Sequence, residues 1–259
     1  MLIAITRDVS PSLGDCQLSH VARTVIDLER ADRQHRAYQH TLASLGCRVL
    51  NLQAEPDMPD AVFVEDVAVV LDEVAVMTRP GAPSRRQEGA SIAELLGRYR
   101  TLRAIEAPGT LDGGDVLRVG RTLYVGESDR TNAEGRAQLQ SAIAEFGYRV
   151  QPVPIRDCLH LKSSVTALDD DTLLVQPKWV EAASFSGFTL IEVDPEEEHA
   201  ANILRIGDVA VMPASFPRTA QKLRDAGFEV VTVDVSELQK AEGATTCCSL
   251  VFNEAAAAR

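Results

Sequence analysis

The chain lacks long apolar runs and any excess of positive charge. No stretch approaches the roughly 18 apolar residues of a membrane helix. The N-terminus, M-L-I-A-I-T-R-D, predicts no signal peptide, so we expect no membrane partner. Asp and Glu number 38 against 26 Lys and Arg, for a formal net charge of -12. Because nucleic acid binding needs a basic face, no nucleic acid partner is expected, and the acidic field favours cationic small molecules.

Paired cysteines are also absent. The cysteines are odd in number and form no C-x-x-C pair: Cys16, Cys47, Cys158, Cys247 and Cys248. We therefore expect no disulfide framework, and reduced thiols predict a cytoplasmic protein. Structural zinc usually has four ligands at paired spacing, and adjacent cysteines on a strand chelate one ion poorly. The sequence thus predicts no metal cofactor.

What the sequence does contain is a repeat. Related stretches begin at 62, 113, 161 and 201, and each has a small or polar start, an apolar strand, a tight turn and a second apolar strand. Turns such as V-G-R and I-G-D are typical of β-hairpins. Helical patterns follow at 84–99, 131–146 and 217–227, with a weaker one near 178–186. A further strand completes each unit, at 103–108, 149–155, 189–193 and 229–235.

A fifth unit can be assembled from the two ends of the chain. Residues 247–252 and 1–6 would pair as strands, followed by a helix within 20–45 and a strand at 48–52. Five ββαβ units predict a five-bladed α/β-propeller, in which the termini share a blade and close the ring. We expect one catalytic domain over 1–259. The alternative is a doubly wound parallel sheet, but a hairpin in every unit argues against it.

The first strands of such a ring begin near its axis. These starts carry carboxylates, an imidazole, an amide and a thiol: Glu65, Asp66, Asp112, Asp115, His160, Asn202 and Cys247. A nucleophile, an acid–base group and an anionic cradle for a cation would therefore meet in one place. This convergence predicts a site for chemistry on a cationic ligand.

Most of these residues also have an ordinary structural interpretation. Cys247 and Cys248 alone are typical of packed small residues, and on a strand they would face opposite sides. Asp112 and Asp115 are typical turn formers around two glycines. His160 is equally compatible with a core histidine. The acidic run E-E-E at 196–198 is interpreted as solvent-exposed.

Seven motifs spread over nearly the whole chain resemble the dimethylarginine dimethylaminohydrolase family. They are P-D-A-V-F-V-E-D, T-R-P-G-A-P-S-R-R, L-D-G-G-D, R-T-N-A-E-G, L-H-L-K-S, A-A-N and T-C-C-S. The resemblance implies the five-bladed α/β-propeller known as the pentein fold. It also implies hydrolysis of asymmetric dimethylarginine or monomethylarginine to citrulline and a methylamine, without a cofactor.

The resemblance assigns roles to the matching residues. Cys247 would be the nucleophile, His160 the acid–base group, and Asp112 the acid that supports them. The implied substrate-binding residues are Asp60 for the α-amino group, Glu65 and Asp66 for the guanidinium, Arg85 and Arg130 for the carboxylate, and Leu18 in a mobile lid over 12–20. Zinc would bind Cys247 as an inhibitor only.

The chemistry explains why these residue types are needed. A guanidinium carbon is a poor electrophile, so attack needs a thiolate. A free cysteine has a pKa of about 8.5, and we expect the cationic substrate to help deprotonate Cys247. Protonated His160 would then donate to the departing amine and, once neutral, activate the water that hydrolyses a covalent thiouronium intermediate.

Two alternatives remain open at this level. One is another guanidine hydrolase or amidinotransferase of the same fold, acting on arginine or agmatine. The other is a catalytically silent propeller that binds arginine-like ligands. The sequence also leaves a homodimer open, and it does not rank the methylarginines as substrates.

Overall fold

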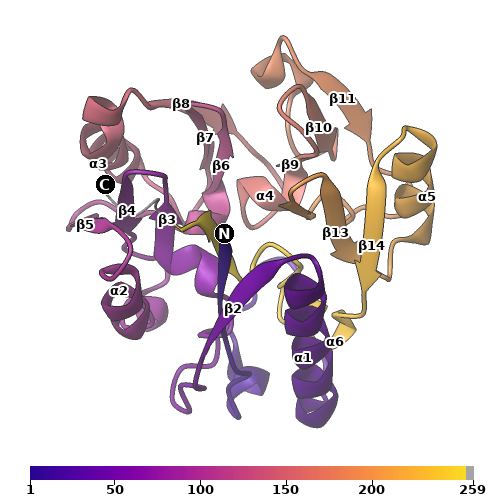
Figure 1. The fold of residues 1–259 in the computed structure, drawn as a ribbon, viewed down its shortest axis with the longest axis horizontal. Helices are drawn as coiled ribbons and strands as arrows, with labels where there is room; N and C mark the ends of the chain where they lie inside the picture. The colour runs from indigo at the N-terminus through magenta and orange to yellow at the C-terminus, as the bar shows by residue number, and fades with distance from the viewer. Residues whose placement is uncertain (255–259) are drawn as a thin grey trace.

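Five three-stranded sheets surround a common centre in the computed structural model, which describes residues 1–254 (Figure 1). In each sheet the middle strand pairs antiparallel with the first strand and parallel with the third. In chain order the blades are β3 (Ala68–Val70), β4 (Val74–Met77) and β5 (Thr101–Ala104); β6 (Val116–Val119), β7 (Thr122–Glu127) and β8 (Arg149–Pro154); β9 (Val165–Ala167), β10 (Thr172–Val175) and β11 (Thr189–Glu192); β12 (Leu204–Ile206), β13 (Val209–Pro213) and β14 (Glu229–Val233); and β15 (Leu250–Asn253), β1 (Leu2–Arg7) and β2 (Cys47–Leu52).

Helices connect the parallel strands at the rim of the ring. They are α2 (Ala90–Leu96), α3 (Ala133–Ile143), α5 (Pro217–Asp225) and α1 (Leu28–Ser44). The weak pattern near 178–186 forms only a 3₁₀ turn, Ala182–Phe185. In the third blade this turn stands where the other blades have an α-helix. None of the helices in the described part of the chain is long and apolar enough to cross a bilayer.

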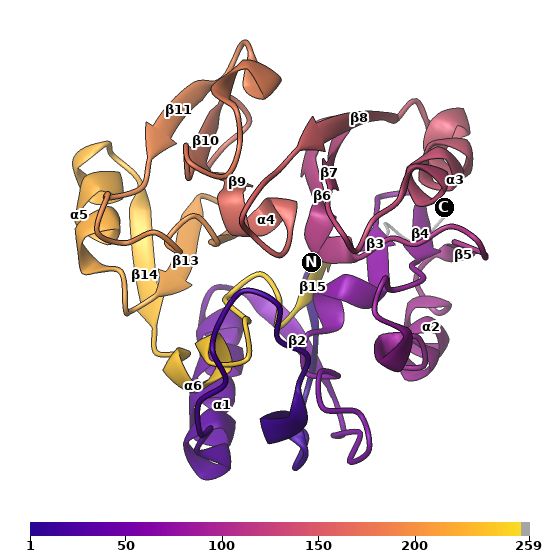
Figure 2. The ribbon, with the colours of Figure 1, turned by 180° about the vertical axis from the view of Figure 1, so that it is seen from behind.

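The fifth blade is made from both ends of the chain. β1 pairs antiparallel with β15, from Leu2 opposite Asn253 to Ile5 opposite Leu250, and parallel with β2. Seen from behind, β15 lies near the centre of the ring (Figure 2). The predicted five-bladed α/β-propeller is confirmed, and the doubly wound sheet is wrong.

The hydrophobic core lies between neighbouring blades. In β1, Ile3 and Ile5 pack toward the blade of β4, whereas Ala4 between them packs toward the blade of β13. In β7, Leu123 and Tyr124 likewise belong to different clusters. Because alternate residues of a strand point to opposite faces, each middle strand is covered on both sides. This explains the nearly continuous apolar runs of these strands.

A tight turn precedes the first strand of each blade. Such turns lie at Val64–Val67, Gly113–Asp115, α4 (Leu161–Ser164), 198–201 and 245–248. The prediction that 247–252 is a strand is therefore wrong at its start, because β15 begins at Leu250. Cys247 and Cys248 still face different surroundings, since a turn also sends successive side chains in different directions: Cys247 is partly exposed and Cys248 is fully buried.

The acidic run at 196–198 is only partly exposed. Glu197 is buried, and its carboxylate accepts hydrogen bonds from the backbone N–H groups of Arg218 (2.8 Å) and Thr219 (2.7 Å). These groups lie in the first turn of α5, where helical N–H groups have no partner within the helix. The exposed interpretation is wrong for Glu197, which caps a helix instead.

Candidate active site

One small cavity, of about 20 Å³, gathers six of the expected site residues. They are Asp60, Asp66, Arg85, Arg130, His160 and Cys247. Cys247 and His160, 87 positions apart in the sequence, therefore share one cavity wall. The volume holds about one water molecule, so a ligand the size of arginine needs a movement of the segments that cover it. Leu18, Glu65 and Asp112 do not line this cavity.

His160 lies between two carboxylates. Its Nε2 is 3.0 Å from Asp112 Oδ2, and its Nδ1 is 3.8 Å from Asp66 Oδ1. Burial alone would lower the pKa of His160, but Asp66 and the hydrogen bond to Asp112 outweigh burial and raise it to about 9. The ring is therefore an imidazolium at neutral pH. Asp112 occupies Nε2, which leaves Nδ1 as the nitrogen that can exchange a proton with a ligand.

The turn at Gly113–Asp115 brings these groups close together. A Cβ on Gly114 would lie 2.6 Å from His160 Nδ1 and 2.7 Å from Asp66 Oδ1, so only glycine fits there. Asp115 is fully buried, and it accepts hydrogen bonds from Ser128, Thr131 and the backbone N–H of Leu161. Asp115 therefore fixes the residue that follows His160 rather than facing the cavity.

Asp66 and Arg85 form a buried ion pair beside the imidazole. Arg85 Nη1 donates to Asp66 Oδ2 at 2.6 Å, and the N–H of Gly114 donates to Asp66 Oδ1 at 2.9 Å. Burial would raise the pKa of Asp66, but His160 and Arg85 hold it down at about 2. The other donors of Arg85 bind the Glu88 carboxylate and the carbonyls of Phe63 and Asp60. Of the five guanidinium N–H groups, one Nη1 hydrogen has no partner among residues 1–254.

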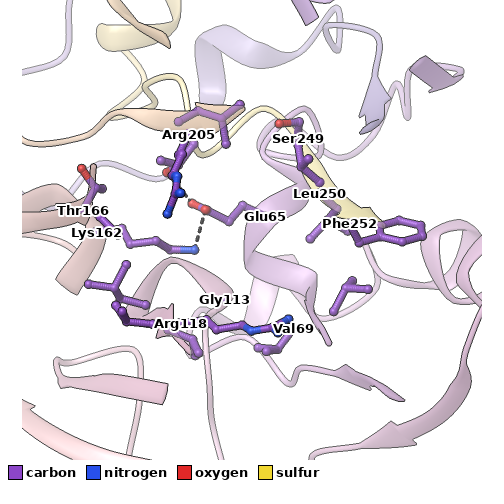
Figure 3. A pocket seen from close by; sticks show the side chains of 18 of the residues that line it. Glu65, Val69, Gly113, Arg118, Lys162, Thr166, Arg205, Ser249, Leu250 and Phe252 are labelled. Atoms are coloured by element: carbon purple, nitrogen blue, oxygen red, sulfur yellow. Dashed lines mark hydrogen bonds and ion pairs between the residues drawn. The ribbon is translucent and has the colours of Figure 1, made fainter. Parts of the chain in front are cut away.

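Glu65 points away from its neighbour Asp66. Its carboxylate is 2.5 Å from Lys162 Nζ and accepts a 2.7 Å hydrogen bond from Thr246 Oγ1. Glu65 and Lys162 line a second, open cavity of about 720 Å³ between the first strands of the blades, as Figure 3 shows. Arg118 and Arg205 line the same cavity but pair with Asp72 and Asp170.

Cys247 is a protonated thiol in this environment. Its Sγ accepts from the N–H of Ala244 at 3.4 Å and lies 4.0 Å from Asn202 Nδ2. Burial, together with the nearby charges of Glu65 and Asp66, raises the pKa of Cys247 to about 12. A positive charge placed beside the sulfur would reverse part of this effect, because opposite charges favour ionisation.

The segment over 12–23 covers the cavity and is held in place by acids. Asp60, itself buried, accepts from the backbone N–H of Gln17 at 3.1 Å. Glu242 accepts from the N–H groups of residues 19, 20 and 21 at 2.9, 2.5 and 2.7 Å. Arg130 Nη2 donates to Ser19 Oγ at 3.1 Å. Leu18 packs against the core cluster that contains Phe63. In Figure 2 this segment (indigo) crosses a yellow loop from the C-terminal part of the chain.

Asp66, Asp112 and His160 are also the one group of metal-ligand type found among the described residues. Their donor atoms lie within 4.8 Å of one another. Each of the three residues already has a partner within the protein. Asp66 accepts from Arg85 and from the N–H of Gly114, and Asp112 accepts from the N–H of Gly81. His160 lies between Asp66 and Asp112. The donor atoms of all three residues are therefore engaged in hydrogen bonds and ion pairs within the protein.

Sequence reasoning missed three residues that shape this site. Glu88 and Lys162 pair with Arg85 and Glu65, and Glu242 holds the covering segment. Glu88 carried a weak signal, since it stands three positions after Arg85 and residues so spaced meet on one side of a helical turn. Lys162 and Glu242 carried no such signal, because their partners are distant in the sequence.

Comparison with known proteins gives consistent matches over the whole fold. The family model described as "N,N dimethylarginine dimethylhydrolase, eukaryotic" matches residues 17–252. An N(G),N(G)-dimethylarginine dimethylaminohydrolase of Streptomyces coelicolor is 43% identical, with 97% of each chain covered. The Pseudomonas aeruginosa protein of the same name is 38% identical, with 96% of this chain and 98% of the relative covered.

Solved structures agree with these relatives. A cysteine-to-serine mutant of the Pseudomonas aeruginosa enzyme, complexed with citrulline, has a TM-score of 0.92 at 37% identity and covers 96% of this chain and 98% of its own. The N-terminal domain of a cyanobacterial arginine dihydrolase bound to its substrate has a TM-score of 0.83 at 20% identity and covers 98% of this chain and 99% of its own. The second likeness shows the fold alone.

Proposed function

This chain belongs to the dimethylarginine dimethylaminohydrolase family, and from that premise we propose that it hydrolyses Nω-methylated L-arginine to L-citrulline and methylamine or dimethylamine. The observation that carries the proposal is the cavity shared by Cys247, protonated His160 and Asp66. A thiol, a proton donor and a buried carboxylate are the groups that displacement of an amine from a guanidinium requires. We further propose that the five blades form one catalytic domain.

The first chemical step is attack by the sulfur of Cys247. Binding of the substrate guanidinium places a positive charge beside the thiol, which lowers the pKa of Cys247, and the thiol proton is released to solvent. The thiolate forms a C–S bond to the guanidinium carbon and gives a tetrahedral adduct. Asp66 keeps the cationic group oriented while this charge is redistributed.

Collapse of the adduct requires a proton for the leaving amine. His160 donates it from Nδ1, the C–N bond breaks, and a thiouronium bound to Cys247 remains. The now neutral ring takes a proton from water, whose oxygen attacks the same carbon. The C–S bond then breaks as the hydroxyl proton of the adduct passes to the departing sulfur, releasing citrulline and restoring the Cys247 thiol. Asp112 stays hydrogen-bonded to Nε2 and stabilises each imidazolium that forms.

The amino-acid end of the substrate is held at the side of the covering segment. Asp60 binds the α-amino group and Arg130, half-exposed and close to Ser19, binds the carboxylate. Arg85 adds a single hydrogen bond to the carboxylate, because its other donors are occupied within the protein. Leu18 supplies apolar cover for the aliphatic chain. Glu65 contributes charge from behind, through its hydrogen bond to Thr246 beside Cys247.

The test is a substrate panel with a matched pair of cysteine variants. Asymmetric dimethylarginine, monomethylarginine, arginine and agmatine are incubated with the protein, and citrulline and amine are measured. We expect citrulline from the methylarginines, loss of turnover with retained binding in Cys247→Ser, and retained turnover in Cys248→Ala. Consumption of arginine or agmatine alone would refute the methylarginine assignment, and full activity of Cys247→Ser would refute the mechanism.

A further inference from the structure

Glu88 lies one step behind the cavity, in the charged row that leads to His160. It is 3% exposed, and its carboxylate accepts from Arg85 Nε at 3.1 Å and Arg85 Nη2 at 2.9 Å. Arg85 in turn donates to Asp66 at 2.6 Å, and Asp66 lies 3.8 Å from His160. Glu88 itself does not line the cavity. Glu88 therefore makes no direct contact with a ligand in this cavity, and its side-chain hydrogen bonds reach toward the cavity through Arg85.

The position of Glu88 is built into the fold. The turn Pro83–Arg85 and the three-residue spacing put its carboxylate against the Arg85 guanidinium. Its backbone carbonyl accepts from Arg7 Nη2, and the same nitrogen donates to Ser91 Oγ at 2.7 Å. Arg7 is fully buried and comes from the end of β1. Glu88 is thus fixed from two blades, which an incidental surface pair would not require.

The charges explain what Glu88 does. Arg85 carries one positive charge and lies between two carboxylates. If Glu88 were neutral, Arg85 would balance Asp66 alone, and the place meant for a guanidinium would lose much of its negative potential. We propose that Glu88 is a positioning residue that turns the guanidinium of Arg85 and offsets its charge, so that Asp66 remains an anionic partner for the substrate cation and for His160. This inference rests on the proposed function.

The test compares a cationic and a neutral ligand in protein that cannot turn over. In the Cys247→Ser background, calorimetry measures the affinities for asymmetric dimethylarginine and citrulline, which share the amino-acid end and differ in charge at the reacting end. We expect Glu88→Gln to weaken dimethylarginine binding about tenfold and citrulline binding less than about twofold. With Cys247 intact, the pH at which kcat/KM levels off should also move lower, because His160 loses anionic support.

The controls separate charge from a general structural role. Glu94→Gln removes an acid of α2 whose pair with Arg98 is exposed, and it should change neither affinity. Glu88→Asp keeps the charge and should retain most of the preference for the cation. Equal weakening of both ligands by Glu88→Gln would overturn the proposal. If the Cys247→Ser protein binds neither ligand, the proposed function itself fails, which is a different result.

A measurement without a change at Glu88 guards against a variant that does not fold. Burial raises the pKa of Glu88 to about 7 against the opposing effect of Arg85. The other charged groups that act on it are Asp60, Asp66 and Arg7. As the pH falls through about 7, Glu88 gains a proton and its charge is lost. The ratio of dimethylarginine to citrulline affinity should then fall, and a constant ratio between pH 8 and pH 6 would contradict the proposal.

Discussion

At the scale of single residues, the neighbours of each ionisable group determine its protonation state in the site. His160 has two carboxylates and is protonated, whereas Cys247 has two carboxylates nearby and is held as a thiol. The same anionic surroundings therefore raise the pKa of both groups and keep both protonated, because they stabilise the cationic imidazolium and disfavour the anionic thiolate. The free protein lacks its thiolate until a cation arrives, which limits reaction of Cys247 with other electrophiles.

This assignment predicts the pH dependence of the reaction. At pH values below the pKa of His160, the free protein contains a Cys247 thiol and a His160 imidazolium. One proton must therefore be lost before the sulfur can attack. We expect kcat/KM to rise about tenfold per pH unit and to level off near pH 9, where His160 loses its proton. Stopped assays from pH 6 to pH 10, corrected for the substrate's amino group, check this. A flat profile below pH 9 would mean that the free protein already holds a thiolate.

Residue types alone predicted part of this. Cys247, His160, Asp66 and Asp60 are brought together as expected. The sequence could not tell that Glu65 faces away from Asp66, because a 3₁₀ turn, unlike a strand, has no simple alternation of faces. Nor could it tell that Arg85 is paired with the internal acids Asp66 and Glu88. The direction of Glu65 depends on contacts with Lys162 and Thr246 of other blades, whereas the pairing of Arg85 depends on how the segments before β3 and after β4 fold together.

At the scale of elements, the covering segment is held mainly by one acid. Glu242 has a left-handed backbone, with φ of 60°, and its carboxylate accepts three consecutive backbone N–H groups from residues 19–21. A non-glycine residue in this conformation is uncommon and persists where the surrounding contacts hold it. The geometry indicates that Glu242 fastens the segment, while Gln17 and Ser19 connect it to Asp60 and Arg130.

Removing this fastening should loosen the segment. We expect Glu242→Ala to accelerate hydrogen exchange at the amides of 19–21 by at least about tenfold, because hydrogen bonds to a charged acceptor are lost. KM should rise several-fold, with kcat changed less. Glu196→Ala, at an exposed acid that pairs with Arg218 on the surface, is the control. Unchanged exchange in Glu242→Ala would show that other contacts hold the segment.

Strands and helices were predicted best where they depend on residues close together in the sequence. The hairpins and the helix starts at Pro217 and Asn132 follow from short-range patterns. The helix predicted in the third blade is absent from the described structure at 178–186. These residues form one short turn, and its Phe185 packs against Tyr124. The start of β15 also differs from the prediction, because residues 245–248 form a turn that is stabilised by partners distant in the sequence. Asn202 receives the N–H of Thr246 at 3.0 Å, a contact that no local pattern reveals.

At the scale of the whole molecule, the ring is closed by pairing between residues 1–5 and 250–254. The N–H of Glu254 donates to the carbonyl of Met1 at 2.8 Å. Residues 254 and 1 can therefore be joined by a short linker, and new ends can be opened in the exposed turn at 170–171 between β9 and β10. Permutation is tolerated at exposed turns that carry few contacts. We expect this permuted chain to fold with kcat/KM within about threefold of the original.

A second permutation provides the comparison. Opening the chain between Gly114 and Asp115 breaks the turn that places Asp112 and His160, and it should abolish turnover even if the protein folds. Circular dichroism melting and the citrulline assay distinguish the two chains. Loss of folding in the chain opened at 170–171 would mean that the order of the blades along the chain, and not only their closure, is needed for stability.

The pairing of β1 with β15 has a mechanical consequence. The two strands run antiparallel, and their outer ends, Leu2 and Asn253, lie opposite each other. Tension applied through these ends would load the inter-strand bonds one after another, as in a zipper, instead of shearing them together. The ring would peel apart at low force, and the turn that bears Cys247 would lose its shape once β15, which follows it, has peeled away. A molecule tethered and stretched through its termini would therefore stop working well before most of its blades unravel.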